Sequence, residues 1–86
     1  MTEDQAIYEK TLIKFGTDRQ IDKLIEEMAE LTTALMHFKY GRENNVAEEF
    51  ADVTIVMKQL KEFFNNDNAI NNWVGIKIDR LSKKVL

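Results

Sequence analysis

The chain has 86 residues with no proline and only three glycines, and this restricts the structures that it can form. Folds built on tight turns depend on proline and glycine, because these residues adopt the backbone angles that such turns need. Apolar residues recur instead at the three- and four-residue spacing of amphipathic helices. The length suits one domain, spanning residues 1–86. The sequence therefore predicts a single all-α domain.

Short segments rich in glycine or asparagine divide the apolar pattern into four stretches. Gly16 suits the end of a helix, and Thr17 or Asp18 suits the start of the next one. Four helices with short connections form a four-helix bundle-like architecture. We expect the helices at residues 4–15, from Thr17 or Asp18 to Gly41, from Asn44 or Asn45 to Phe64, and at 69–86, with a turn at 65–68.

Apolar residues make up 44 % of the chain, which is ample for a body of this size. A domain this short buries only roughly 60–65 % of its surface. We place the apolar excess at a subunit interface and expect a homodimer or homotetramer. The residues expected to face the core are Ile7, Tyr8, Leu12, Phe15, Ile21, Leu24, Ile25, Met28, Leu31, Leu35, Phe38, Val46, Phe50, Val53, Met57, Leu60, Phe64, Ile76, Ile78, Leu81 and Val85.

Two pairs of carboxylates with i/i+3 spacing lie on the second and third expected helices. The pairs are Glu27 with Glu30, and Glu49 with Asp52. This spacing directs both members of a pair to the same side of a helix. At roughly 100° per residue, Glu49 lies about 50° from the centre of its apolar stripe, whereas Glu48 faces solvent. A carboxylate directed toward a core is costly unless a cation binds it.

If these two helices pack antiparallel, the four carboxylates meet at one place and attract cations. Ligation by oxygen alone is typical of Mg²⁺, Mn²⁺ or Ca²⁺. A di-iron centre would need Glu-x-x-His on two helices, and His37, the only histidine, follows neither pair at that spacing. Thiolate metal sites and disulfides are excluded, because the chain has no cysteine. The pattern predicts a divalent-cation site made of carboxylates.

Glu26 extends the first pair to the pattern E-E-x-x-E, and the second pair reads E-x-x-D after a spacer. This combination resembles the MazG-like all-α nucleotide pyrophosphohydrolases. The likeness also covers the stretches FGTDRQIDKLIEEMAELTTALMHFKYGR, VAEEFADVTIVMKQLKEFF and KIDRLSKKV, so it extends from Phe15 to Val85. It is nearest to the small phage-type and Firmicute-type members of the family.

The resemblance implies an Mg²⁺-dependent enzyme that hydrolyses a nucleoside triphosphate to the monophosphate and pyrophosphate. By resemblance the members of the two carboxylate pairs are the metal ligands, with Mn²⁺ as a possible substitute for Mg²⁺. Glu26 would orient or activate water, or support the ligands. Lys77 and Arg80 match basic positions of the family that would hold phosphate, and Lys83 and Lys84 would assist. A solvated face on a terminal helix is an equally good interpretation of these four residues.

Other functional classes are partly excluded by charge and hydropathy. The net charge is −3, and no basic stripe precedes the last ten residues, which argues against nucleic acid as a partner. No apolar run approaches the about 20 residues that span a bilayer, and the start MTEDQAIYEK lacks the features of a signal peptide. We therefore expect a cytoplasmic protein with no membrane partner.

Two alternatives to an enzyme stay open: a non-catalytic helical interaction module that retains the acidic motif, and a nucleotide sensor without turnover. The pattern also leaves open the base and sugar of the nucleotide, the number of metal ions, and the role of the asparagine-rich segment 65–72. Trp73 can either stack on a base or cover a core or interface. Its place in the fold decides between these roles.

Overall fold

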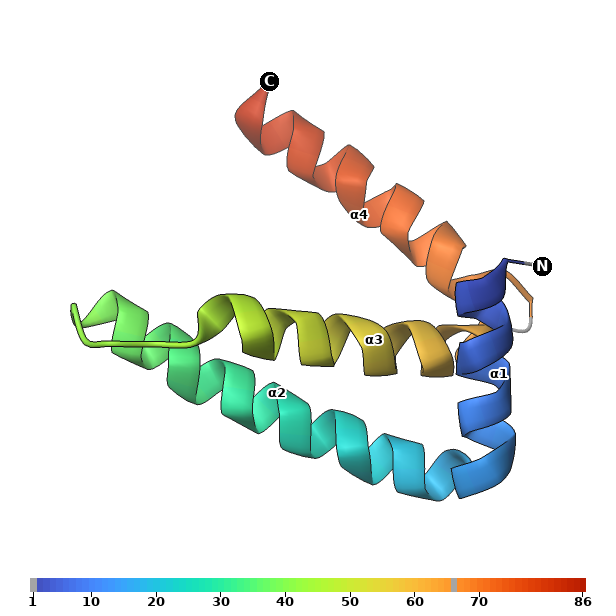
Figure 1. Ribbon diagram of the computed structural model, residues 1–86. Coiled ribbons are helices and arrows are strands. Elements are labelled where there is room, and N and C mark those ends of the chain that lie inside the picture. Colours follow the sequence, from blue (N-terminus) through green and yellow to red (C-terminus); the bar gives the residue numbers. More distant parts are fainter. Residues whose placement is uncertain (1, 66) are drawn as a thin grey trace.

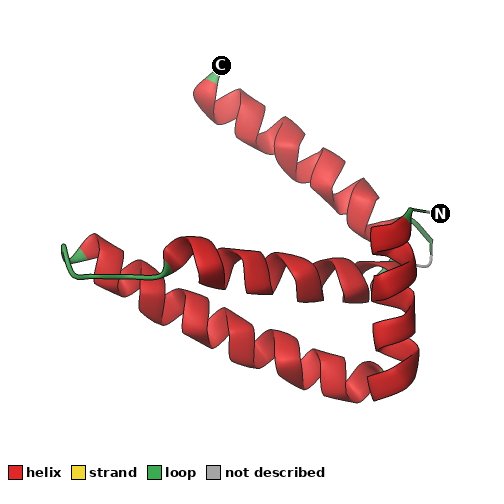
Figure 2. Ribbon diagram, viewed as in Figure 1, coloured by secondary structure: helices red, strands yellow, loops and turns green. Residues whose placement is uncertain are grey.

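The computed structural model describes residues 2–65 and 67–86, and within these ranges the regular structure is entirely helical. It consists of four helices, which confirms the predicted all-α class (Figures 1 and 2). Over the described residues, none of them has both the length and the apolar content to cross a lipid bilayer. The helices are α1 (Glu3–Phe15), α2 (Thr17–Lys39), α3 (Val46–Phe64) and α4 (Ala69–Val85).

The helix boundaries follow local hydrogen bonding. Gly16 ends α1 and also serves as the N-cap of α2, in place of the predicted Thr17 or Asp18. Asn45 occupies the N-cap position of α3 as predicted. The predicted turn at 65–68 includes Asn66, which lies outside the described residues. In the described part of this turn, the Asn65 side-chain oxygen accepts a hydrogen bond of 2.8 Å from the backbone of Ile70, at the start of α4.

Helices α2 and α3 form the body of the molecule, and α1 crosses them at one end (Figure 1). The chain reverses direction between α2 and α3, so the two helices run antiparallel (Figure 1). Their shared core is small and consists of Ala34 from α2 together with Val53, Val56 and Leu60 from α3. The small Ala34 side chain, only 1 % exposed, lets the two helices approach closely at this point.

Helix α4 projects away from this body (Figure 1). Over the described residues it contacts α3 alone and has no buried residue. The radius of gyration is 15.6 Å, against about 12 Å for a compact chain of this length. The accessible surface is 7111 Å², which exceeds the area expected of a folded monomer of this mass by about 1,800 Å². One chain alone is therefore incompletely packed.

Many of the predicted core residues are exposed in the single chain. Val53 and Leu60 are buried as predicted, but Ile25 on α2 is 62 % exposed and Phe50 on α3 is 57 % exposed. The prediction is wrong for a single chain because α4 contacts only α3 over the described residues. The remaining apolar faces of the other helices are therefore left uncovered. The exposed members are Ile7, Phe15, Ile25, Met28, Leu35, Phe38, Phe50, Met57, Phe64, Ile76, Ile78, Leu81 and Val85.

Candidate functional site

Carboxylates from α2 and α3 converge where the two helices face each other. Glu27 of α2 and Glu49 and Asp52 of α3 each place one oxygen within 4.8 Å of the others. Glu26, Glu27 and Glu30 form a second such group on α2. The two groups share Glu27, so all five acids singled out by the sequence belong to one continuous cluster.

The two most enclosed carboxylates are those of Glu27, which is 5 % exposed, and Glu49, which is 8 % exposed. The inward orientation predicted for Glu49 is confirmed. Glu27 is the more buried of the two. It lies two turns from Ala34 on the same side of α2, and that side packs against α3.

Each of these carboxylates has one oxygen with a protein partner and one without. Glu27 Oε1 is 3.0 Å from Lys23 Nζ, and Asn45 Nδ2 donates to Glu49 Oε1 at 2.8 Å. The Oε2 atoms of both glutamates are buried and accept no hydrogen bond from any described residue. A buried oxygen without a partner is costly, more so when it is charged. The cluster is thus short of positive charge.

The donor set fits a divalent cation such as Mg²⁺ or Mn²⁺. It consists of carboxylate oxygens from two helices, which is the hard-ligand chemistry that these ions prefer. The unpartnered Oε2 atoms of Glu27 and Glu49 are free to serve as ligands. The Lys23 ammonium already lies against Glu27, so the position attracts positive charge.

The outer part of the cluster has altered acid–base behaviour. The charge of Glu27, followed by burial and by Glu49, raises the pKa of Glu30 above the ordinary value for glutamate. The hydrogen bond to Glu27, with further attraction from Glu26, raises the pKa of Lys23. Glu26 is exposed on the rim. Glu30 therefore keeps its proton to a higher pH than an isolated glutamate does.

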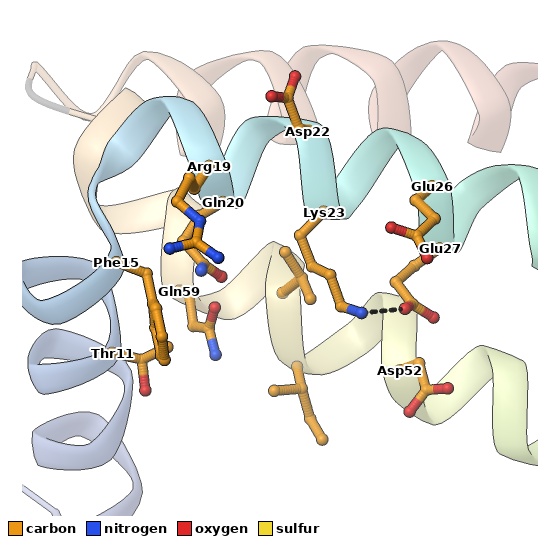
Figure 3. Close-up of a pocket in the computed structure, with 12 residues that line it drawn as sticks. Thr11, Phe15, Arg19, Gln20, Asp22, Lys23, Glu26, Glu27, Asp52 and Gln59 are labelled. Carbon is orange, nitrogen blue, oxygen red and sulfur yellow. Dashed lines mark ion pairs between the residues drawn. The ribbon is translucent and has the colours of Figure 1, made fainter.

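Three of the five acids, Glu26, Glu27 and Asp52, line a cleft of about 740 Å³ that extends along α2 and α3 to α1, whereas Glu30 and Glu49 do not line it. This volume lies within the about 300–1,000 Å³ range of small-molecule sites. Figure 3 shows Glu27 and Asp52 at one end, Phe15 and Gln59 near α1 at the other, and Lys23 between them. The cleft is large enough for a ligand that extends well beyond the carboxylates.

The basic residues of α4 lie elsewhere. Lys77, Arg80 and Lys84 are exposed, and the described residues that line the cleft all belong to α1, α2 and α3. Lys77 Nζ lies 6.0 Å from the centre of the Trp73 ring, and Trp73 is 54 % exposed, so it covers no core within the chain. A single chain does not bring these side chains to the acidic cluster.

Other residues of the cleft have no counterpart in the sequence motif. Arg19 and Lys23 supply positive charge inside it, and Gln20 and Gln59 are buried in its wall. The spacing contained a signal for them: Gln20 precedes Glu27, and Gln59 follows Asp52, by two helical turns each. His37, the only histidine in the sequence, is half-buried and does not line the cleft.

The chain matches no family model, no curated protein and no solved structure. The geometry of the cluster and its cleft, together with the resemblance of the acidic motif, therefore carries the functional argument.

Proposed function

We propose that this protein is an Mg²⁺-dependent nucleoside triphosphate pyrophosphohydrolase of the MazG-like type, which converts a (deoxy)nucleoside triphosphate and water to the monophosphate and pyrophosphate. One observation carries the proposal. Glu27, Glu49 and Asp52 meet within 4.8 Å, and two of their buried oxygens lack partners beside a cleft of nucleotide size. The acidic motif and its resemblance to that family add support.

The site is acidic and its substrate is anionic, so a cation has to join them. Bound Mg²⁺ would neutralise charge on the phosphate oxygens and make a bound water more acidic. Glu27, Glu30, Glu49 and Asp52 would hold this ion, and Mn²⁺ suits the same oxygen ligands. Because these carboxylates come from two packed helices, they would need little reorganisation to hold the ion when substrate arrives.

We assign proton transfer to residues on the exposed side of the cluster. The attacking water must lose a proton while the bond between the α-phosphate and the bridging oxygen breaks. A carboxylate of the cluster that does not bind the ion can accept this proton as a general base. Glu26 lies on the rim of the cleft and can orient the water. Lys23 is the nearest cation to the cluster, and it can exchange Glu27 for a phosphate oxygen of the substrate.

We also propose that copies of the chain associate as a homodimer or homotetramer. One chain has about 1,800 Å² more accessible surface than a folded monomer of this mass. Each partner in a standard interface buries about 800 Å², which is less than this excess. Apolar side chains are exposed along α4. In such an assembly, Lys77, Arg80 and Lys84 would hold phosphate in the site of a neighbouring copy, because they do not reach the cleft of their own chain.

The activity is tested by measuring pyrophosphate release from canonical and modified ribo- and deoxyribonucleoside triphosphates, with Mg²⁺ and with a chelator. We expect pyrophosphate and the monophosphate with Mg²⁺ and neither with the chelator. The Glu49→Gln variant should lose the activity, and Glu48→Gln, an exposed neighbour on α3, should keep it. Absence of product from every substrate with the wild-type chain contradicts an enzymatic function.

The exposed apolar face of α4 favours a second candidate, a helical interaction module without catalysis. The same assay, combined with nucleotide binding by calorimetry, separates the possibilities. Tight binding of a triphosphate without product identifies a nucleotide sensor. If the protein neither binds a nucleotide nor releases product, the interaction module is the better account.

A further inference from the structure

Two buried amides lie in the cleft wall at the end away from the carboxylates. Gln20 of α2 and Gln59 of α3 are each 8 % exposed. The Oε1 atom of Gln59 is buried and has no hydrogen-bond partner among the described residues. A buried amide oxygen without a donor is unfavourable. It therefore marks a place where a ligand N–H group would restore a hydrogen bond.

On both helices the amide has the same spacing from the acid. Gln20 lies seven residues before Glu27 on α2, and Gln59 lies seven residues after Asp52 on α3. Seven residues make two turns, or about 10.5 Å along the axis at 1.5 Å per residue. Because the helices run antiparallel, both amides lie at the α1 end and both acids at the other (Figure 3). This separation suits a nucleotide, whose phosphates and base edge lie at opposite ends.

An aromatic ring and a cation complete the amide end. Phe15 at the end of α1 is 40 % exposed and lines the cleft, and the Arg19 guanidinium lies 5.4 Å from its ring centre. Aromatic rings and guanidinium planes are the surfaces on which bases stack. Lys23 lies between the amides and the carboxylates (Figure 3).

Building on the proposed function, we propose that the α1 end of the cleft is a nucleobase site, in which the amides of Gln59 and Gln20 bind the hydrogen-bonding edge of the base. An amide offers a donor and an acceptor side by side, and base edges present the complementary pair. Phe15, with Arg19 beside it, offers a stacking surface for the base ring. The ligand class is then a nucleotide with its base, and neither inorganic polyphosphate nor a base-free sugar phosphate fills the cleft.

The direct test is NMR of the ¹⁵N-labelled wild-type chain. The sequence holds three glutamines, Gln5, Gln20 and Gln59, so their side-chain NH₂ signals are assigned with one variant each. The probes are AMP, CMP, GMP, UMP and base-free ribose 5-phosphate. We expect at least one monophosphate to shift the Gln20 and Gln59 signals, while Gln5 on α1 serves as the internal control. Absence of a shift with every nucleotide overturns the proposal, and so does an equal shift with ribose 5-phosphate.

A kinetic measurement tests the same site independently. Gln59→Leu should lower kcat/KM for the preferred nucleoside triphosphate by about 5- to 150-fold, the discrimination that one good amide–base pair supplies. It should therefore lower the preference for that substrate over ribose 5-triphosphate by the same factor, and Gln5→Leu should not change this preference. If the wild type hydrolyses all substrates, with and without a base, at one rate that Gln59→Leu does not alter, the base site is wrong and the enzymatic function stands.

The two measurements also identify the opposite case, in which the base site is right and the enzymatic function is wrong. If no substrate yields pyrophosphate while nucleotides shift the Gln20 and Gln59 signals and ribose 5-phosphate does not, the base site is supported and the enzymatic function is wrong.

Discussion

Glu27 and Glu49 account for most of the chemistry that we ascribe to this protein. Each side chain is almost fully enclosed between α2 and α3, and each has one oxygen without a partner. Lys23 and Asn45 satisfy the other oxygens, so the cluster is only partly compensated. Removing one partner from a buried charge is more costly than never burying the charge. The arrangement therefore makes sense as a site that a cation completes.

Glu49→Gln tests this cluster by replacing a single carboxylate oxygen. Glutamine keeps an oxygen for Asn45 but loses the negative charge and one ligand oxygen. We expect Mg²⁺ and Mn²⁺ affinity to fall by at least about tenfold, since even the loss of a group supporting a ligand has that effect. The free energy of unfolding without metal should not fall by more than about 0.5 kcal/mol. Isothermal titration calorimetry and urea unfolding measure the two quantities.

The matched control for this substitution is Glu48→Gln, which makes the same chemical change one residue away on the exposed side of α3. It should leave metal affinity and stability unchanged. Equal losses of metal affinity in both variants would mean that ions bind to the general negative charge of the chain and not to this cluster.

Glu30 gives the metal-free protein a characteristic pH dependence. Its pKa is raised in the folded state, chiefly by Glu27. Between the unfolded and folded pKa values the folded state holds more protons, so stability falls as pH rises through that window. Below the unfolded pKa this penalty is absent. In Glu30→Gln the contribution should disappear, so the difference in unfolding free energy between variant and wild type should grow as pH rises from 4 to 7.

Urea unfolding at several pH values, with chelator, measures this difference. A difference that stays constant with pH would show that Glu30 titrates as an isolated glutamate. Saturating Mg²⁺ should reduce the dependence, because a cation at the cluster offsets the repulsion that raises the pKa.

At the scale of helices, the joint between α1 and α2 fixes the shape of the cleft. Gly16 is the single residue between them and has φ of 87° and ψ of 153°. This region is essentially restricted to glycine. The sharp joint carries Phe15 across the ends of α2 and α3, where its ring becomes a wall of the cleft.

Gly16→Ala should therefore destabilise the fold by about 1–3 kcal/mol through backbone strain. A methyl group at this position would meet no atom within 4 Å, so steric overlap does not contribute. Gly75→Ala is the control, because Gly75 lies inside α4 with equally open surroundings. That change should stabilise by about 0.5–1 kcal/mol, since alanine favours a helix. Urea unfolding of both variants checks the opposite signs, and destabilisation by both would contradict the assigned backbone role.

The sequence predicted the elements well and the site in part. Periodicity and the glycines at 16 and 41 located the helices, because these are local effects. The inward position of Glu49 followed from its angle on the helix. The wall near α1 was not predicted. The two-turn spacing of Gln20 and Gln59 from the acids is a weak signal that belongs to no motif, and the crossing of α1 turns their surroundings into a cleft. The outward position of α4 also had no local signal, because an amphipathic helix indicates that it needs a partner and not which one.

At the scale of the whole molecule, exposed apolar surface is the dominant property. The chain has 7111 Å² of accessible surface and α4 buries nothing. An isolated chain with such a surface is expected to associate, because large exposed apolar patches mark interfaces. Association would also explain why so many apolar residues of the stripes are exposed in one chain.

Sedimentation velocity tests this expectation. The wild-type chain should sediment as a dimer or tetramer at micromolar concentration. Ile78→Glu, which puts a charge on the apolar side of α4, should shift it toward the monomer, and Ile78 is 60 % exposed, so the fold itself tolerates the change. Asn72→Glu, at an exposed polar position of the same helix, should have no effect. A monomeric wild type would contradict the proposed assembly.

The most direct test of the central claim is to locate a bound ion with substoichiometric Mn²⁺, whose unpaired electrons broaden the NMR signals of nearby nuclei. We predict that backbone signals around Glu27, Glu49 and Asp52 disappear first, that excess Mg²⁺ restores them, and that Glu49→Gln weakens the effect. Broadening spread evenly over the acidic surface, or centred away from the contact between α2 and α3, would contradict a divalent-cation site in this cluster.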